Sequence, residues 1–356
     1  MTERMRIGRR EIGVGCPAYI VAELSANHSQ DFERAAALVR AAKEAGADAV
    51  KLQTFTADTL TLCSSAEPFR ISGGTPWDHR TLHDLYREAS MPWEWQPRLK
   101  RVAEDLGMDL FSTAFDPSSV DFLEAMAVPA HKIASFEIVD LPLIERVART
   151  GKPLLISTGM ATLDEIEEAV AAARRAGAGG VVLLKCTSAY PAPPDEVNLR
   201  TIPDLTRVFG VPVGLSDHSL CDSVAVAAVA LGACVVEKHF TLSRKDPGPD
   251  SAFSLEPREF RAMVEAVRTA EKALGAVRYG PGPQEEKSLL FRRSLFAVED
   301  VAAGEELTPR NVRSVRPGHG LHPRHASEII GRRASRDIAR GTPLGWDLIR
   351  REGQTA

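Results

Sequence analysis

The sequence predicts a (β/α)8 barrel, also called a TIM barrel, followed by a small second domain. Short apolar segments of β type alternate with amphipathic helical segments, and this alternation indicates parallel strands because parallel neighbours need a crossover connection. Eight such units within about the first 290 residues fit a closed barrel better than an open sheet. In addition, no glycine-rich phosphate loop follows the first strand, as an open dinucleotide-binding sheet would usually have.

The eight predicted strands are short, mostly apolar segments. They cover residues 18–25, 48–54, 108–113, 131–135, 153–158, 181–187, 211–216 and 233–240. Two of the intervening helices are particularly clear. Residues 31–47 carry apolar side chains at helical spacing, at Phe32, Ala35, Ala36, Val39 and Ala42. Residues 162–180 open with a capping-box pattern and close on glycines.

Composition narrows the class of protein. The chain has 356 residues and a formal net charge of −4, which indicates no polyanionic partner such as nucleic acid. Its five cysteines are scattered without metal-type spacing, as in reduced cytoplasmic proteins. The charged N-terminus lacks the apolar core of a signal peptide, and no apolar run is long enough for a membrane span. We therefore expect a soluble cytoplasmic protein.

Polar side chains end nearly every predicted strand. They are Glu23, Ser25, Lys51, Gln53, Ser112, Thr113, Lys132, Ser135, Ser157, Thr158, Lys185, Thr187, Ser216, His218, Glu237 and His239, with Glu137 just beyond the fourth strand. Because the carboxyl ends of barrel strands meet at one face, these groups predict a polar funnel there. Alternation along the last strand directs Lys238 away from that funnel.

The residue types suggest the chemistry of the funnel. Lys51 and Lys132 among hydroxyl groups suit a small polyanion such as a phosphate plus a carboxylate. His218 and His239 end neighbouring strands, and paired imidazoles suit Mn²⁺, Fe²⁺ or Co²⁺. An alternative is a Schiff-base aldolase that uses Lys51, Lys132 or Lys185. A non-enzymatic sugar-binding protein is a third alternative.

Several ordered motifs resemble those of the sialic acid synthase family. They are AELSANH, GADAVKLQTF, FSTAFD, KIASFEI, ISTGMAT, KCTSAYPAPP, GLSDHS, EKHFTL and GPDSAFSLEP. Within the family, these motifs are most similar to those of the branch that makes pseudaminic acid. The resemblance implies that phosphoenolpyruvate condenses with 2,4-diacetamido-2,4,6-trideoxy-L-altrose to a nine-carbon 2-keto acid, with release of phosphate. N-acetylneuraminate or legionaminate synthesis from another N-acetylated sugar is the alternative within the family.

The resemblance also implies roles for individual residues. The catalytic carboxylates would be Glu23 and Glu137. His218 and His239 would bind a divalent metal, most often Mn²⁺, with Mg²⁺ or Co²⁺ as alternatives. Phosphoenolpyruvate would contact Lys51, Thr113, Lys132, Ser135, Ser157, Ser188 and Ser216. The sugar would contact Gln53, Tyr190, Asp250 and Arg316. Ser188 departs from the asparagine of the neuraminate branch, which puts that phosphate contact in doubt.

The predicted domains are a barrel over 1–280, a Gly/Pro-rich linker over 281–291 and a second domain over 292–356. In the second domain EDVAAGEELT at 299–308 recurs as RDIARGTPLG at 336–345, which indicates a compact fold with internal symmetry. FRRSLF and RPGHGLHP resemble the antifreeze-like (SAF, β-clip type) domain that ends this family. The resemblance implies a homodimer in which this domain, with Arg316, covers the barrel of the partner.

Overall fold

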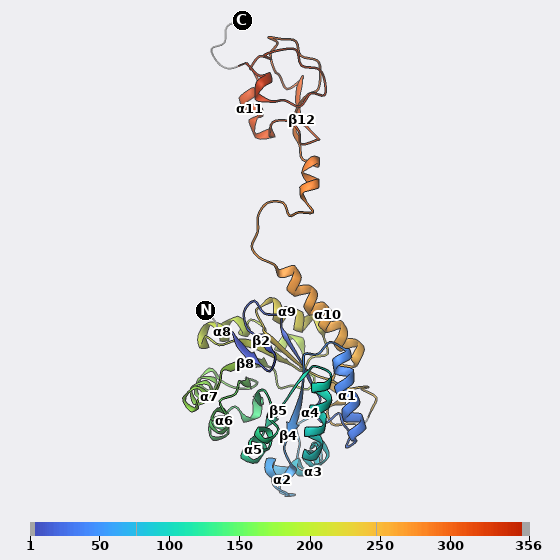
Figure 1. Ribbon diagram of the computed structural model, residues 1–356, viewed down its shortest axis with the longest axis vertical. Coiled ribbons are helices and arrows are strands. Elements are labelled where there is room, and N and C mark those ends of the chain that lie inside the picture. Colours follow the sequence, from blue (N-terminus) through green and yellow to red (C-terminus); the bar gives the residue numbers. More distant parts are fainter. Residues whose placement is uncertain (1–3, 76, 247, 351–356) are drawn as a thin grey trace. The chain divides into compact units, whose positions relative to one another are not determined.

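The computed structural model describes residues 4–75, 77–246 and 248–350, and the chain divides into two compact units, Met1–Gly275 and Ala276–Ala356. The first unit is a closed barrel of parallel strands (Figure 1). Its strands, in chain order, are β3 (Tyr19–Glu23), β4 (Ala49–Thr54), β5 (Asp109–Ala114), β6 (His131–Ile133), β7 (Leu154–Ser157), β8 (Val181–Cys186), β9 (Val213–Asp217) and β10 (Val235–His239). The barrel closes where β10 pairs with β3, and every predicted strand is confirmed.

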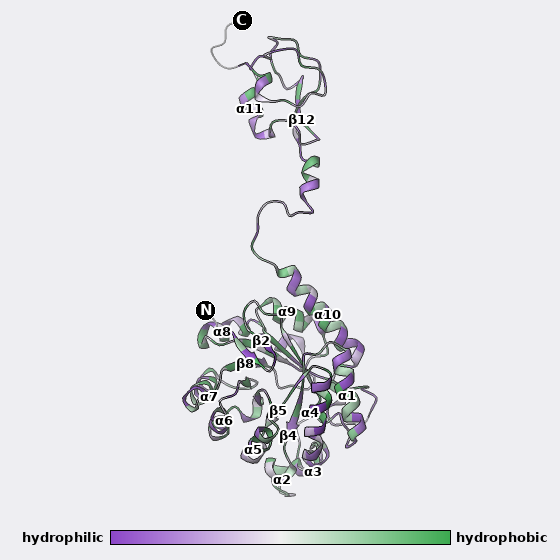
Figure 2. Ribbon diagram, viewed as in Figure 1, coloured by the Kyte–Doolittle hydropathy of each residue, from purple (hydrophilic) through white to green (hydrophobic). Residues whose placement is uncertain are grey.

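A helix packs outside the barrel after each strand. These helices are α1 (Phe32–Glu44), α4 (Gln96–Asp105), α5 (Pro117–Ala125), α6 (Leu141–Ala148), α7 (Leu163–Ala176), α8 (Thr201–Phe209), α9 (Asp222–Ala230) and α10 (Pro257–Leu274). Hydrophilic and hydrophobic residues alternate along them in Figure 2, as expected of helices with one buried face. Among the described residues, no helix is both long and apolar enough to cross a membrane.

The two helices read most clearly from the sequence begin and end as predicted. In α1 the buried side chains include Ala35, Ala36, Val39 and Ala42. In α7 Thr162 and Glu165 form the reciprocal capping box, and Gly177 ends the helix with a left-handed backbone.

An N-terminal hairpin that the sequence analysis did not anticipate lies at the amino-terminal end of the barrel. Its strands β1 (Met5–Ile7) and β2 (Arg10–Ile12) pair antiparallel, and Ile7 and Ile12 are fully buried. The turn needs glycine at position 8, where φ is +52° and a Cβ atom would collide with the carboxylate of Asp109. The hairpin therefore covers the end of the barrel opposite the strand carboxyl ends.

The connection between β4 and α4 is a long insert with two short helices, α2 (Ala57–Leu60) and α3 (Leu82–Ala89). Because it leaves the carboxyl end of β4, the insert lies at the end of the barrel where active sites of this fold are found.

The second unit is built around the predicted sequence repeat. Its strands β11 (Ser294–Ala297) and β12 (Val312–Val315) pair antiparallel, and α11 (Ala326–Ile329) packs on the same small core. Val301 and Ile338, which are equivalent in the repeat, exchange backbone hydrogen bonds of 2.9 and 2.8 Å. Asp300 and Asp337 each accept a 2.7 Å hydrogen bond from the backbone of the other copy. The internal symmetry is therefore confirmed.

Candidate active site

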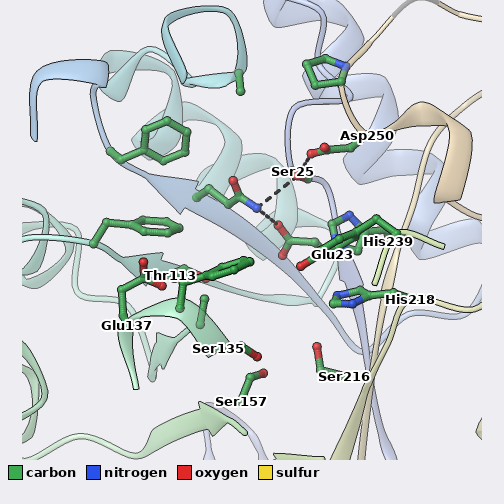
Figure 3. A pocket seen from close by; sticks show the side chains of 18 of the residues that line it. Glu23, Ser25, Thr113, Ser135, Glu137, Ser157, Ser216, His218, His239 and Asp250 are labelled. Atoms are coloured by element: carbon green, nitrogen blue, oxygen red, sulfur yellow. Dashed lines mark hydrogen bonds between the residues drawn. The ribbon is translucent and has the colours of Figure 1, made fainter. Parts of the chain in front are cut away.

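The carboxyl ends of the barrel strands surround a cavity of about 330 Å³ (Figure 3). Of the fifteen predicted site residues, all but Ser188 and Arg316 line it. Those that do are Glu23, Lys51, Gln53, Thr113, Lys132, Ser135, Glu137, Ser157, Tyr190, Ser216, His218, His239 and Asp250. The predicted funnel is therefore present, and, with Cys186 of β8, the cavity draws on all eight strands and the loops that follow them.

Lys51 occupies the centre of the floor of the cavity. Its Nζ lies 2.7 Å from Glu23 Oε2 and 3.4 Å from Glu237 Oε1. It also donates a 3.0 Å hydrogen bond to Thr113 Oγ1. All four side chains are buried. Parallel pairing favours the contact with Glu23, because Glu23 on β3 stands directly beside Lys51 on β4 in the register of the sheet.

Lys132 is the second buried cation of the floor. It donates a 2.7 Å hydrogen bond to Ser157 Oγ, and its Nζ lies 3.9 Å from Glu237 Oε1. Ser216 Oγ donates to the same carboxylate oxygen at 3.2 Å. Glu237 therefore bridges the two lysines, while its other oxygen is buried without a hydrogen-bond partner.

The electrostatics of the floor favour an anionic ligand. Burial lowers the pKa of Lys132, whereas for Lys51 the effect of burial is outweighed by Glu23 and Glu237, which raise its pKa. Burial would raise the pKa of Glu237, but Lys132 and Lys51 hold it below its usual value. Burial, supported by the charge of Glu237, raises the pKa of Glu23 to about 7. At neutral pH the two ammonium groups are therefore only partly neutralised.

Hydroxyl and amide donors complete this end of the cavity. Ser135 Oγ accepts a 3.1 Å hydrogen bond from the backbone N–H of Gly159, in the loop after β7. A Cβ atom at position 159 would lie 2.2 Å from Ser188 Oγ and 2.7 Å from Ser135 Oγ. Only glycine lets the two hydroxyls approach the backbone so closely. Ser188 thus lies beside the lining serines without itself lining the cavity.

His218 and His239 lie next to each other, with their ring centres 5.2 Å apart. His218 Nδ1 lies 2.9 Å from the carbonyl oxygen of Thr187, so the ring donates there and keeps its Nε2 lone pair for a ligand. His239 Nδ1 is buried without a hydrogen-bond partner, and burial holds the pKa of this ring well below its usual value. Both rings therefore fit the donor chemistry that a divalent metal needs.

Two histidines alone do not complete a metal site. Across the described ranges, no group of three or more His, Cys, Asp or Glu side chains is placed to hold an ion.

Neutral and acidic hydrogen-bonding groups continue from Glu23 along the cavity. Gln53 Nε2 donates to Glu23 Oε1 at 3.0 Å and to Ser25 Oγ at 3.1 Å. Ser25 Oγ in turn donates to Asp250, which also accepts a 3.2 Å hydrogen bond from the backbone of Ala26. The ring of Tyr190 stacks on His218 with their centres 4.2 Å apart. These groups form a chain of polar contacts beside the histidines (Figure 3).

Glu137 lies apart from the ion pairs, in a 3-10 turn, Ser135–Glu137, that follows β6. Its Oε2 is buried without a hydrogen-bond partner. Burial raises its pKa to about 7, although Lys132 opposes the rise. A carboxyl group with this pKa can both donate and accept a proton near neutral pH.

The structure narrows the set of lysines that could form a Schiff base. Lys185 points out of the barrel, donates to the Cys186 carbonyl at 2.6 Å and to Thr187 Oγ1 at 3.2 Å, and does not line the cavity. The prediction that Lys185 could be a nucleophile in this site was therefore wrong, because alternation along β8 points Cys186, and not Lys185, into the barrel. Lys238 faces away as predicted and pairs with Asp217 at 2.5 Å.

Among the lining residues that were given no role from the sequence, three carry hydroxyl, thiol or carboxyl side chains in the predicted strands. Glu237 was identified only as a strand end, although it contacts both lysines. Ser25 was also noted only as a strand end, and Cys186 was not singled out. Strand alternation was the available signal for Cys186, since it is two residues beyond Leu184 on the inward face of β8.

A (β/α)8 barrel whose strand ends hold two buried lysines, hydroxyl donors and a histidine pair defines a class of enzyme that binds a small polyanion beside a second substrate. Residues 38–279 match the NeuB family and residues 292–350 match the SAF domain. The chain belongs to the NeuB family, and the resemblance read from its motifs is confirmed.

Individual relatives agree with this assignment. A pseudaminic acid synthase of Helicobacter pylori is 45% identical over 94% of this chain and 98% of its own length. One from Campylobacter jejuni is 44% identical over 92% of this chain and 95% of its own length. The crystal structure of an N-acetylneuraminic acid synthetase from Leptospira borgpetersenii, in complex with citrate, superposes with a TM-score of 0.72 at 29% identity, covering 81% of this chain and 96% of that one.

Proposed function

We propose that this protein is a pseudaminic acid synthase, which condenses phosphoenolpyruvate with 2,4-diacetamido-2,4,6-trideoxy-L-altrose. The observation that carries the proposal is the buried pair Lys51 and Lys132 among hydroxyl donors, in a chain 45% identical to a protein named for this activity. The lysines match the phosphate and carboxylate of phosphoenolpyruvate, and the chain from Gln53 to Asp250 matches the hydroxyl and acetamido groups of a sugar.

The reaction forms one carbon–carbon bond and breaks one carbon–oxygen bond. C3 of phosphoenolpyruvate attacks the aldehyde carbon of the open-chain sugar, and the aldehyde oxygen takes up a proton. Water adds to the cationic C2 and loses a proton, and the C2–O bond to phosphate then breaks to leave the 2-keto group. Lys51 and Lys132 stabilise the phosphate and carboxylate throughout. Glu137 and Glu23, with pKa values near 7, carry the protons.

His218 and His239 would hold a divalent metal in this proposal, most readily Mn²⁺, with Mg²⁺ or Co²⁺ as alternatives. When bound, such an ion would orient the sugar aldehyde and polarise its oxygen. The free Nε2 of His218 and the unpartnered Nδ1 of His239 support the assignment.

The proposal also includes a homodimer in which Arg316 from one chain completes the site of the other. Arg316 is exposed in the loop after β12. Large apolar side chains are exposed around the mouth of the barrel, in the segments that follow β6 and β7; these are Phe136, Val139, Met160 and Leu163. Exposed apolar side chains in neighbouring segments support a protein interface there.

The test is incubation with phosphoenolpyruvate and the trideoxy sugars of altro and manno configuration, measuring released phosphate and product mass. We expect phosphate and a nine-carbon 2-keto acid from the altro sugar. Turnover of the manno sugar alone would instead indicate legionaminate synthesis. With ¹⁸O-labelled water, the label should enter the C2 oxygen of the product and not the phosphate. Borohydride should leave no covalent adduct; a mass adduct on Lys51 or Lys132 would support the Schiff-base aldolase.

A further inference from the structure

One side of the cavity carries no charged group. From Phe55 to Ala89, all eight lining residues are apolar or aromatic. Six of them, here called the apolar wall, are Phe55, Leu60, Ile71, Leu82, Leu85 and Tyr86. Phe55 and Leu85 are buried, and the other four are half-buried at the cavity surface. The reaction proposed above uses none of them.

The insert after β4 builds this wall and is held in place at both ends. Thr56 caps α2, and Thr81 caps α3 with a 3.1 Å hydrogen bond from Asp84 N–H. On the far side of the mouth, Trp77 Nε1 donates a 3.0 Å hydrogen bond to the carbonyl of Pro249. The two caps order the helices within the insert, and the hydrogen bond from Trp77 ties the insert to the loop after β10, so its apolar face is preformed.

The loop between β3 and α1 holds the end of α3. Gln30 Nε2 donates to the carbonyls of Glu88 at 2.8 Å and Ser90 at 2.6 Å. His28 Nε2 lies 3.3 Å from the carbonyl of Ala89. The same loop begins with Ser25, which contacts Gln53 and Asp250. The apolar wall and the polar sugar-binding groups are therefore positioned by one segment.

A preformed apolar surface favours a ligand group that needs no hydrogen bond. A methyl group gains by leaving water there, whereas a hydroxyl loses its water partners and finds few in return. One methylene more or less in such a pocket changes specificity by roughly 10- to 200-fold.

The direction of the sugar chain decides which carbon meets the wall. The aldehyde carbon, C1, has to reach phosphoenolpyruvate at the floor, where Lys51 and Lys132 lie inside the strands. The insert begins only after Thr54, the last residue of β4, and so lies nearer the mouth. C6 is the carbon farthest from C1 in an open-chain hexose, so it extends toward the mouth and the insert.

We propose that the apolar wall binds the C6 methyl group of the sugar and makes the enzyme select 6-deoxy over 6-hydroxy substrates. This inference depends on the proposed synthase function, but not on the altro configuration of the sugar.

The experiment measures kcat/KM for a 6-deoxy sugar and its 6-hydroxy counterpart, each with both acetamido groups and the same configuration. We expect the wild type to prefer the 6-deoxy sugar at least 10-fold. Among the half-buried wall positions, at least one of Leu60→Asn, Ile71→Asn and Leu82→Asn should reduce this preference about 10-fold. Leu62→Asn is the matched control, because Leu62 belongs to the same insert but is 64% exposed and does not line the cavity.

A third sugar has the C6 methyl group but a hydroxyl in place of the 4-acetamido group. It distinguishes binding of the C6 methyl from binding of the acetamido methyl. If the variants change discrimination at C4 and not at C6, the wall holds an acetamido methyl and the proposal is wrong. A wild-type preference below 10-fold also overturns it. If the enzyme turns over the 6-deoxy and 6-hydroxy sugars of manno configuration and not those of altro configuration, the proposed sugar is wrong. The C6 inference is then tested by comparing the two manno sugars. Turnover of 6-hydroxy sugars alone would overturn both.

Discussion

Two carboxyl groups of the cavity, Glu137 and Glu237, are buried in different environments, and only that of Glu237 stabilises the charged form. Glu137 and Glu237 each bury one oxygen without a hydrogen-bond partner. For Glu237 the two lysines compensate, and its pKa stays low. Glu137 has no ion-pair partner within the described part of the chain, and its pKa rises to about 7. Stability is therefore reduced at Glu137 in exchange for a group that can transfer protons.

The cost of burying Glu137 should depend on pH. Its pKa rises from 4.5 to about 7 on folding, which corresponds to about 3 kcal/mol. Below pH 4.5 the Glu137 carboxyl is protonated in both the folded and the unfolded protein, so its burial does not lower the free energy of unfolding. As the pH rises through 7, the carboxyl of the folded protein loses its proton, and the stability that depends on the protonated form is lost. Glu137→Gln should therefore be more stable than wild type at pH 8, by up to about 3 kcal/mol, with no difference near pH 4.

Denaturant unfolding at the two pH values measures this difference. The same variant should lose roughly 10²- to 10⁴-fold in kcat, as expected for a proton-transfer group. Equal stabilities of the two proteins at pH 8 would show that the carboxyl is not held in the way described.

The histidine pair makes a separate prediction. His218→Ala and His239→Ala should each abolish phosphate release and reduce Mn²⁺ binding measured by calorimetry, with little change in melting temperature. Chelation of the wild type should abolish activity, and Mn²⁺ or Co²⁺ should restore it. His79→Asn is the control, because His79 is exposed on the insert and has a left-handed φ of +72° that asparagine tolerates. Full activity after exhaustive chelation would contradict the metal assignment.

At the scale of elements, the loop between β3 and α1 links parts of the site that are distant in sequence. Asn27 donates 2.9 Å hydrogen bonds to Phe240 O and Ser254 Oγ, while Gln30 reaches the end of α3. Left-handed backbone at Ser25 and Gln30 bends the loop so that its side chains can point to opposite sides. The segment from Asn27 to Gln30, which begins within the AELSANH motif, is therefore a structural link between the insert and the loop after β10.

Removing the link at Gln30 should loosen α3. Gln30→Gly suits the left-handed φ of +55° and removes two hydrogen bonds, so the amides of residues 82–90 should exchange with solvent roughly 5- to 30-fold faster. The KM for the sugar should rise while the KM for phosphoenolpyruvate stays the same. Arg40→Ala, on the exposed side of α1, is the control. Unchanged exchange of α3 would show that the loop does not hold the insert.

At the scale of the whole molecule, the proposed shared site needs groups from both units. The barrel supplies lysines, hydroxyls, histidines and carboxylates, but the lining residues of its cavity include no arginine. Arg316, in the second unit, follows β12 and is exposed, and it precedes Pro317, whose ring restricts the backbone. A guanidinium on such a loop can bind sugar oxygens at low entropic cost.

A shared site predicts complementation between inactive chains. Arg316→Ala mixed with His239→Ala should regain activity after subunit exchange, because one site of each heterodimer combines an intact barrel with an intact arginine. After complete and random exchange, up to roughly a quarter of the wild-type sites would be intact. Mass spectrometry of the intact dimers verifies the exchange. A mixture that has exchanged and stays inactive would refute the shared site.

The sequence by itself determined the barrel, the polar funnel and most of the residues that line the cavity. These depend on local rules: alternation places side chains on a strand, and strand carboxyl ends carry the chemistry of this fold. The motifs then added residues that lie outside the strands, such as Tyr190 and Asp250, through family resemblance and not through periodicity.

Only the tertiary structure decided which groups touch. Glu237 bridges Lys51 and Lys132 because β6 lies opposite β10 in the closed barrel and β4 lies two strands from each, and no spacing along the chain encodes that distance. Lys185 was wrongly considered as a nucleophile of this site, because the contacts of β8 with its neighbouring strands decide which of its side chains point into the barrel. The hairpin β1–β2 and the apolar wall were missed for the same reason: short segments with weak periodicity take their structure from contacts with distant residues.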